Sequence, residues 1–311
     1  ESLIAFSPSD TYGRALVAGL LNTLKVGVIG IILATFTGLI IGLARLSSNG
    51  LLAGLSAALV ELVRGVPLLL QLLLWYSLMT ASLPHPREAW EPLEGWFISN
   101  RGIQMPRFTS NGLWLALSLI GTLGGAVTVL AAGRGTRTRK VAMVITLVSF
   151  IDLVLLAMLT PVEMPGRNRF RFTGGWNLTP ECTALLFGLT LYTGVFIGEI
   201  LRSGILAVPR GQHEAAAALG LSPGVATRLI ILPQALRLAI PPLVSQYLNL
   251  VKNSSLAVAI GYPDLVSVAN ITINQTGQAL EGILIIMGAY MTISLILSGL
   301  LNLYNRKVLA R

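Results

Sequence analysis

Two short groups of polar residues interrupt the long apolar stretches of this sequence. In the first, Glu61 and Arg64 stand three positions apart, so a helix would place them on one face, just before a break at Gly65 and Pro67. The second, residues 252–255, reads Lys-Asn-Ser-Ser and offers hydrogen-bond donors and acceptors. Gln71 is an isolated amide within the same apolar stretch as the first group. The residues that could guide a polar or zwitterionic ligand are therefore Glu61, Arg64, Gln71, Lys252, Asn253, Ser254 and Ser255.

Each of these candidates also has a purely structural interpretation. Glu61 and Arg64 could form an ion pair near a membrane surface that holds the break in place. The long stem of Lys252 could let its amine reach the interface, and Gln71 could bond a neighbouring helix. The residue types alone leave both interpretations open.

Chemistry that makes or breaks covalent bonds is not expected. The single cysteine, Cys182, excludes an internal disulfide and a cysteine-based metal site. The two histidines, His85 and His213, are far apart in the sequence and have no acidic cluster around them. We therefore predict no catalytic residue, no metal site and no cofactor bound by this chain.

The composition places these residues in a membrane. Of the 311 residues, 54% are hydrophobic and 11% are charged, and the mean hydropathy is +0.75, whereas soluble domains have about 25% charged residues. Several apolar runs approach the roughly 18–20 residues that cross a ~30 Å hydrocarbon layer. The net charge of +9 is explained by anionic lipid and by the cytoplasmic bias of basic residues, so no nucleic-acid partner is expected.

The sequence predicts an all-α, polytopic membrane protein with about seven spanning helices. The expected spans are about 16–43, 51–78, 113–132, 141–159, 183–201, 235–251 and 282–304. Glycine and proline interrupt the second span, and Pro241 and Pro242 interrupt the sixth. The compact basic loop 133–140 contains no acidic residue and indicates a cytoplasmic side, which places the start of this segment outside and the C-terminus inside.

Residues 81–181 are interpreted as an insertion into a five-helix core formed by residues 15–80 and 182–308. The inserted segment has two soluble-looking loops around a hairpin of two weaker spans. Trp90, Trp96, Trp114 and Trp176 fall where an aromatic belt at the membrane interface is expected. Residues 1–311 together are expected to form one membrane domain.

The segment "GQHEAAAALGLSPGVATRLIILP", residues 211–233, has the features of two short helices joined by a sharp turn. Ala215–Ala218 are strong helix formers, and Gly220 suits a left-handed stop after them. Ser222 and Pro223 suit the start of a second helix, which is expected to end before the final proline. A helix of about eight residues is not stable alone, so we expect it to dock on another protein; a helix lying on headgroups would need a bulkier apolar face.

The same segment resembles the EAA loop of permease subunits of bacterial ABC importers. The resemblance rests on Glu214-Ala215-Ala216, on Gly220 and on the "IILP" that ends at Pro233. Three further stretches are similar to the polar-amino-acid branch of that family, the MetI-like histidine/glutamine permeases: "GLLNTLKVGVIGIILATFTGLIIGLARLSSN", "VELVRGVPLLLQLLLWY" and "KNSSLAVAIGYPDL". The matches cover roughly 15–80 and 185–308, and the insertion is similar to that of the general L-amino-acid permeases of Gram-negative bacteria.

This resemblance implies a permease subunit that carries amino acids into the cytoplasm by alternating access, in the bacterial inner membrane. Residues 208–222 would be a coupling helix in a groove of a separate ATPase, through Gly211, His213, Glu214, Ala215, Ala216, Gly220 and Leu221. The implied partners are two copies of that ATPase, which bind ATP and Mg, a periplasmic amino-acid-binding protein, a second permease subunit expected to differ from this one, and lipid. No Gly-x-x-x-x-Gly-Lys-Ser/Thr loop occurs in the sequence, so the chain itself is not expected to be an enzyme.

A stand-alone secondary transporter or channel is the alternative. It would need a coupling-ion site of its own and commonly an internal repeat, and the sequence shows neither. One position departs from the family pattern, because Asn253 stands where many members have an acidic residue. The missing counter-charge argues against a transporter devoted to cationic amino acids and favours broad or neutral specificity.

Overall fold

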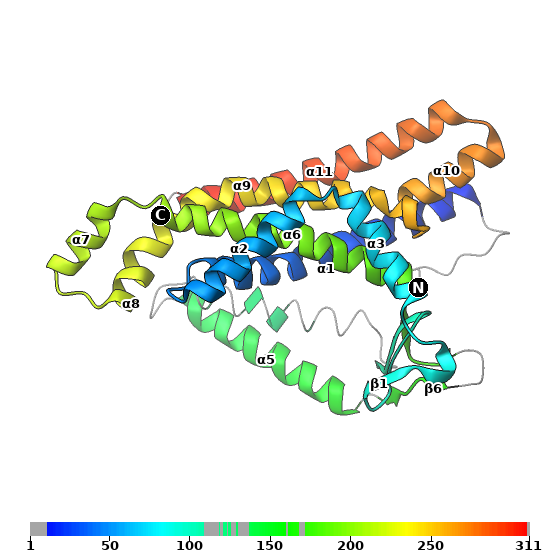
Figure 1. Cartoon of the computed structure of the whole chain (residues 1–311), viewed down its shortest axis with the longest axis horizontal. Coiled ribbons are helices and arrows are strands. Elements are labelled where there is room, and N and C mark those ends of the chain that lie inside the picture. Colours follow the sequence, from blue (N-terminus) through cyan, green and yellow to red (C-terminus); the bar gives the residue numbers. More distant parts are fainter. Residues whose placement is uncertain are drawn as a thin grey trace. The chain divides into compact units, whose positions relative to one another are not determined.

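The computed structural model describes residues 11–108, 137–159, 161–167 and 172–309, with residues 118, 121, 122, 124, 125 and 129. The chain divides into two compact units, Glu1–Ser82 with Thr179–Arg311, and Leu83–Leu178. Among the described residues, the first unit is helical, and the second combines short strands with the long helix α5 (Arg137–Leu159). Figure 1 shows the elements of both units.

The helical unit is built from four long helices and several shorter ones. The long helices α1, α6, α9 and α11 run alongside one another (Figure 1). The elements of this unit are α1 (Tyr12–Arg45), α2 (Gly50–Gly65), α3 (Leu68–Ala81), α6 (Pro180–Leu206), α7 (Arg210–Ala218), α8 (Pro223–Ala226), the π-helical turn η2 (Thr227–Ile231), α9 (Leu232–Asn253), the 3-10 segment η3 (Ser254–Ile260), α10 (Leu265–Thr276) and α11 (Ala279–Leu309).

Polar side chains fix where these helices begin. The Oδ1 atom of Asn49 accepts from the backbone N–H groups of Leu51 and Leu52, at 3.0 and 3.3 Å, and so caps α2. The hydroxyl of Thr179 caps α6 in the same way. Each cap satisfies N–H groups that have no partner inside the helix, which is why helices start at such residues.

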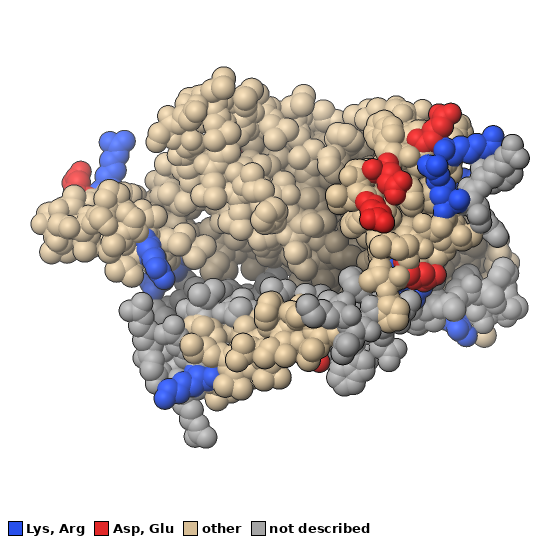
Figure 2. Space-filling view, turned by 90° about the horizontal axis from the view of Figure 1, so that it is seen from below, with Lys and Arg blue, Asp and Glu red and all other residues tan. Residues whose placement is uncertain are grey.

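Four or five candidate membrane spans lie within this unit. Four helical segments are long and apolar enough to cross a membrane: Tyr12–Arg45, Pro180–Leu206, Pro223–Ile260 and Ala279–Gly299. The pair α2 and α3, bent by 103°, makes a fifth if it counts as one span. Figure 2 shows a broad surface without charged side chains, of the kind that suits lipid.

Of the seven expected spans, five correspond to these segments. The span expected at 113–132 lies mostly outside the described residues. The span expected at 141–159 falls within the helix α5 (Arg137–Leu159) of the second unit. The count of seven therefore stays a prediction, whereas the helical, polytopic fold class is confirmed.

Glycine allows α1 and α6 to cross in close contact. A Cβ atom added at Gly198 of α6 would lie 3.1 Å from the carbonyl oxygen of Gly38 and 3.1 Å from the backbone nitrogen of Gly42, both on α1. Each helix thus contributes glycine at spacings of four residues, Gly38 and Gly42 on one and Gly194 and Gly198 on the other. Small residues at this spacing let helices approach in a membrane, where apolar burial gives no driving force.

The prediction that the second short helix ends before Pro233 is wrong. The helix begun at Pro223 continues through η2 into α9 and η3, so Pro223–Ile260 forms one long helical segment. The π-helical turn Thr227–Ile231 comes just before Leu232 and Pro233. Proline has no N–H to donate to the preceding turn, and the local π geometry lets the helix continue past it.

The second unit contains a four-stranded antiparallel sheet in the order β1-β2-β3-β8 and two two-stranded ribbons, β4-β5 and β6-β7. The sequence predicts loops where these strands lie, on either side of the expected hairpin of spans, although "WFISNRGIQM" contains two short alternating runs. The elements of this unit are η1 (Pro86–Glu88), β1 (Trp90–Leu93), β2 (Trp96–Ser99), β3 (Gly102–Met105), β4 (Arg107–Phe108), α5 (Arg137–Leu159), β5 (Val162–Glu163), β6 (Gly166–Arg167), β7 (Phe172–Thr173) and β8 (Trp176–Leu178).

Candidate functional site

The helices α7 and α8 form a short projecting element at one end of the helical unit (Figure 1). α7 ends where the N–H of Gly220 donates to the carbonyl of Ala217 at 2.9 Å and the N–H of Leu221 donates to that of Ala216 at 3.1 Å. Gly220 has a φ of +72°, in the left-handed region that disfavours side chains. The turn between the helices is therefore set by backbone geometry that the sequence predicted.

Most side chains of this element face solvent. Ala216 is buried, whereas Gly211, His213, Glu214, Ala215 and Gly220 are exposed and Leu221 is half-buried. The neighbouring apolar side chain of Leu219 is 76% exposed. Such exposure on a nine-residue helix indicates a surface available to another molecule, since a helix this short depends on packing.

The break in the second span is held by Gln71. Its side-chain amide donates two hydrogen bonds of 2.8 Å, to the carbonyl oxygens of Val63 and Val66, which lie on the other side of the bend. Gln71 is buried, and Glu61 is exposed. The predicted pairing of Glu61 with Arg64 is absent among the described ion pairs, because the Arg64 guanidinium lies 5.2 Å from the ring centroid of Phe196.

Arg64 also lines a cavity of about 420 Å³ between the end of α2, α6 and α9. Three further polar side chains, Glu199, Ser203 and Gln246, lie in its wall. The Nε of Arg45 bonds to Oε1 of Glu199 at 2.8 Å, while Arg202 approaches its other oxygen at 3.7 Å. The wall thus combines a cation, a carboxylate and an amide with apolar surface, which suits a small polar ligand.

The sequence did not single out this cavity. Glu199 and Arg202, three positions apart on α6, form a local ion pair, and no sequence pattern indicated a role for Arg45, Phe196 or Gln246. The relevant signal was Glu199 itself, an acidic residue within a long apolar helix. Its partner Arg45 comes from a helix 154 positions away, and such pairing cannot be read from spacing.

Residues 252–255 lie at the end of α9 and the start of η3, and they are not among the residues that line the cavity. Ser254 is buried, and its hydroxyl donates to the carbonyl of Val251 at 2.7 Å. The hydroxyl of Ser255 donates to the carbonyl of Lys252 at 2.8 Å. Lys252 is exposed and Asn253 and Ser255 are half-buried, so these three side chains are the accessible members of the group.

A buried acid stands between the last two spans, at Asp264. Its Oδ1 accepts from the N–H of Ser267 at 2.8 Å and caps α10, and the side chain of Tyr290 on α11 also faces the carboxyl. The residue is fully buried, and this loss of water raises its pKa to about 6 despite the backbone hydrogen bonds. Asp264 belongs to the "KNSSLAVAIGYPDL" stretch, but no feature of the sequence predicted a role for it.

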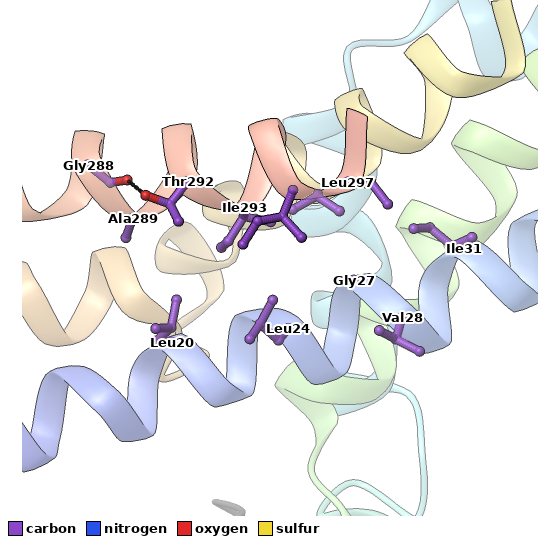
Figure 3. Close-up of a pocket in the computed structure, with 12 residues that line it drawn as sticks. Leu20, Leu24, Gly27, Val28, Ile31, Gly288, Ala289, Thr292, Ile293 and Leu297 are labelled. Atoms are coloured by element: carbon purple, nitrogen blue, oxygen red, sulfur yellow. Dashed lines mark hydrogen bonds between the residues drawn. The ribbon is translucent and has the colours of Figure 1, made fainter. Parts of the chain in front are cut away.

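A second cavity, of about 600 Å³, lies between α1 and α11 (Figure 3). Its wall is made of aliphatic side chains and glycine apart from Thr292, whose hydroxyl donates to the carbonyl of Gly288 at 2.8 Å. A zwitterionic ligand would find no charge or free donor there. This cavity is therefore suited to apolar groups, and the cavity at Arg64 is the better candidate for a polar ligand.

Comparison with known proteins identifies the family. Residues 121–310 match the family described as "Binding-protein-dependent transport system inner membrane component". The chain belongs to this family. Two relatives are 41% identical to it: the general L-amino acid transport system permease protein AapQ of Rhizobium johnstonii, and the glutamate/glutamine/aspartate/asparagine transport system permease protein BztB of Rhodobacter capsulatus.

Both matches cover 99% of this permease, and 80% of AapQ and 82% of BztB. The permease protein YhdX of Escherichia coli is 45% identical over 99% of this chain and 81% of its own. Among solved structures, an amino acid ABC transporter crystallised with histidines has a TM-score of 0.59 at 24% identity, over 95% of both chains. The methionine transporter MetNI has a TM-score of 0.55 at 15% identity, over 95% of this chain and 96% of its own.

Membership of this family indicates the cellular location of the permease and its role in a transport complex. It is a multi-pass protein of the inner membrane and the transmembrane subunit of an ABC transporter, which works with a substrate-binding protein and an ATPase. ATP hydrolysis is done by the partner ATPase, and the permease is not itself an enzyme. The residues described here include no group of His, Cys, Asp or Glu that could hold a metal ion.

Proposed function

We propose that this permease carries amino acids into the cytoplasm by alternating access, driven by a separate ATPase that holds the α7–α8 element in a groove. The observation that carries the proposal is this projecting element, a nine-residue helix with an exposed apolar tip at the end of a spanning segment. The names of the relatives AapQ and BztB support amino acids as the transported class. Orientation follows from the coupling: this end and the C-terminus are cytoplasmic, and α1 begins outside.

The proposed complex contains two ATPase copies, a periplasmic amino-acid-binding protein and a second permease subunit that differs from this one. ATP and Mg would bind to the ATPases only. When the ATPases close, the α7–α8 element would move with them and tilt α9, which continues directly from it. The core would then open toward the loaded binding protein, and hydrolysis would reset it.

The cavity at Arg64 is the proposed place where an amino acid pauses inside the permease. The guanidinium of Arg64 would attract the α-carboxylate, and Glu199 would attract the α-ammonium group. The cation–π contact with the ring of Phe196 holds the Arg64 guanidinium in place. Lys252, Asn253 and Ser255 would form a second polar stretch of the pathway, away from this cavity.

Coupling is tested by substitutions in the element itself. Gly220→Ala forces a side chain into the left-handed region, at a cost of about 1–2 kcal/mol, and Glu214→Arg reverses an exposed charge without disturbing a buried group. Gly224→Ala, at ordinary φ and with no atom near the added Cβ, is the matched control for the first.

The readout is binding-protein-stimulated ATP hydrolysis and amino-acid uptake in proteoliposomes. We expect both Gly220→Ala and Glu214→Arg to lower uptake per ATP hydrolysed, or to weaken ATPase association, while Gly224→Ala behaves as the unmodified permease. If uptake, association and coupling all survive both changes, the α7–α8 element is not the coupling site.

A further inference from the structure

The four-stranded sheet of the second unit has one buried face and one exposed face. Phe97 and Gln104 are paired in neighbouring strands and are only 7% and 3% exposed. Phe97 also stacks on Phe172 with the ring centroids 5.2 Å apart. Since successive residues of a strand point to opposite faces, the residues on either side of Phe97 and Gln104 belong to the other face.

That other face is apolar where β1 meets β2. Trp90 is paired with Ile98, and Leu93 is paired with Trp96, with a bulge between the two pairs. Paired residues in antiparallel strands share a face, so all four side chains lie together. Trp90 is 57% exposed, Leu93 65% and Trp96 37%.

The apolar face continues across β3 and β8. Ile98 is paired with Ile103, Ile103 with Leu178, and Met105 with Trp176. Trp176 is 50% exposed, and the more central positions are half-buried. The whole face therefore carries eight apolar side chains, three of them tryptophan, and no charged one.

The apolar composition of this face differs from that of a sheet face in contact with water. An antiparallel sheet with one face on a core normally carries polar residues on the other, and a contiguous exposed apolar surface marks contact with another phase or molecule. Tryptophan is the side chain that most favours the boundary between headgroups and acyl chains. The composition therefore fits an interfacial lipid environment better than water.

Chain connectivity joins this sheet directly to a spanning helix. β8 ends at Leu178 and the spanning helix α6 begins at Pro180, so only Thr179 separates the last strand from a span. The apolar helix α5, with 23 residues, ends at Leu159, three residues before β5. The headgroup region extends only about 5–8 Å beyond the hydrocarbon on each side.

We propose that the apolar face of the β1-β2-β3-β8 sheet is a membrane-contact surface, which rests on the phospholipid headgroup–acyl boundary on the side where α6 begins. Trp90, Trp96 and Trp176 anchor it at the level of the headgroups. This role is independent of substrate and of the coupling assigned to α7–α8.

The test is tryptophan quenching in the assembled transporter, reconstituted in phospholipid nanodiscs. Variants keep one of Trp90, Trp96 and Trp176 at a time, with the other tryptophans of the chain changed to Phe. We expect lipid brominated near the headgroup end of its acyl chains to lower the emission of each retained tryptophan at least two-fold. Aqueous iodide should have a smaller effect on the same variants.

Two results would overturn the proposal. Quenching by iodide but not by brominated lipid would show that the face lies in water. Protection from iodide only after the substrate-binding protein is added would show that the face docks that protein instead.

A second measurement avoids the multiple tryptophan changes. In a Cys182→Ser background, a nitroxide is attached at Leu93→Cys on the apolar face or, as the control, at Arg101→Cys on the exposed turn between β2 and β3. The label at position 93 is expected to be more accessible to oxygen than to a water-soluble nickel chelate, and the label at position 101 should show the opposite order. The same order at both positions would contradict the proposal.

Discussion

The side-chain amide of Gln71 and the carbonyl oxygen of Val63 are joined by a 2.8 Å hydrogen bond across the 103° bend between α2 and α3. Because a bend exposes backbone carbonyls that no helical N–H can reach, the amide supplies what the helix has lost. This contact makes Gln71 a determinant of the bend, and it gives the one amide within the second expected span a defined partner.

Replacing Gln71 by Leu should therefore destabilise the permease. Two carbonyl groups in a largely buried place would lose their donor, at a cost of about 1–3 kcal/mol. The measurement is the thermal unfolding midpoint of the purified permease in detergent, where we expect a clear decrease. Gln275→Leu, an exposed amide on α10, is the control and should leave the midpoint nearly unchanged; equal effects of the two changes would contradict the role given to Gln71.

The close crossing of α1 and α6 predicts a strong effect of a single methyl group. Gly198→Ala would place a Cβ atom 3.0 Å from a side-chain carbon of Ile41 and 3.1 Å from backbone atoms of Gly38 and Gly42, and such overpacking costs about 1–3 kcal/mol. Gly54→Ala meets no atom within 4 Å and should be neutral or slightly stabilising. The measurement is the unfolding midpoint of the two variants in detergent. An unchanged midpoint for Gly198→Ala would contradict the close contact between α1 and α6.

The buried carboxyl of Asp264 predicts a pH dependence of stability. Its pKa rises from 3.8 to about 6 on folding because burial disfavours the charged form. The protonated side chain is thus favoured in the folded state, and its contribution is fully present below pH 4 and is lost as the pH rises through 6. The shift corresponds to about 3 kcal/mol at most.

Asp264→Asn should remove this dependence, since the amide has no proton to release and its oxygen can still cap α10. We expect the unmodified permease to lose stability relative to Asp264→Asn between pH 4 and pH 7, so that the variant is the more stable of the two at pH 7. The measurement is the unfolding midpoint of both proteins across this range. Parallel curves would show that the carboxyl does not titrate in this window.

The half-buried amide of Asn253, next to Lys252, predicts a change in selectivity. Asn253→Asp adds a negative charge that can attract a cationic side chain, a gain of about 0.2–1 kcal/mol for an accessible pair. Uptake of arginine or lysine relative to glutamine should rise about two- to five-fold in proteoliposomes with the same binding protein. Asn270→Asp, exposed on α10, is the control; an unchanged ratio for Asn253→Asp would remove this residue from the pathway.

Local chemistry explains what could be predicted from the sequence. Long apolar runs predicted the core spans, and Gly220 with Ser222 and Pro223 predicted the turn between α7 and α8, because these features depend on neighbours in the chain. The prediction that the helix ends before Pro233 is wrong because a π-helical turn allows the helix to continue past the proline. The backbone hydrogen-bond pattern of that turn is not evident from the sequence.

The polar cavity could not be predicted, because its parts come from distant helices. Arg64 pairs with Phe196 rather than with Glu61, three positions away, and Glu199 pairs with Arg45 from another helix. Spacing predicts which residues share a helical face, but the choice among partners is made by packing in three dimensions. The small sheet was missed for a similar reason, since its strands are at most four residues long and β8 joins from 71 positions after β3.

The uninterrupted helical segment Pro223–Ile260 has a mechanical consequence. Its 38 residues have a contour length of about 57 Å, from the turn after α7 to Ile260. If the segment moved as one body, a tilt of about 10° at one end would displace the other end by roughly 10 Å. The two internal prolines, Pro241 and Pro242, are the points at which bending would reduce this displacement.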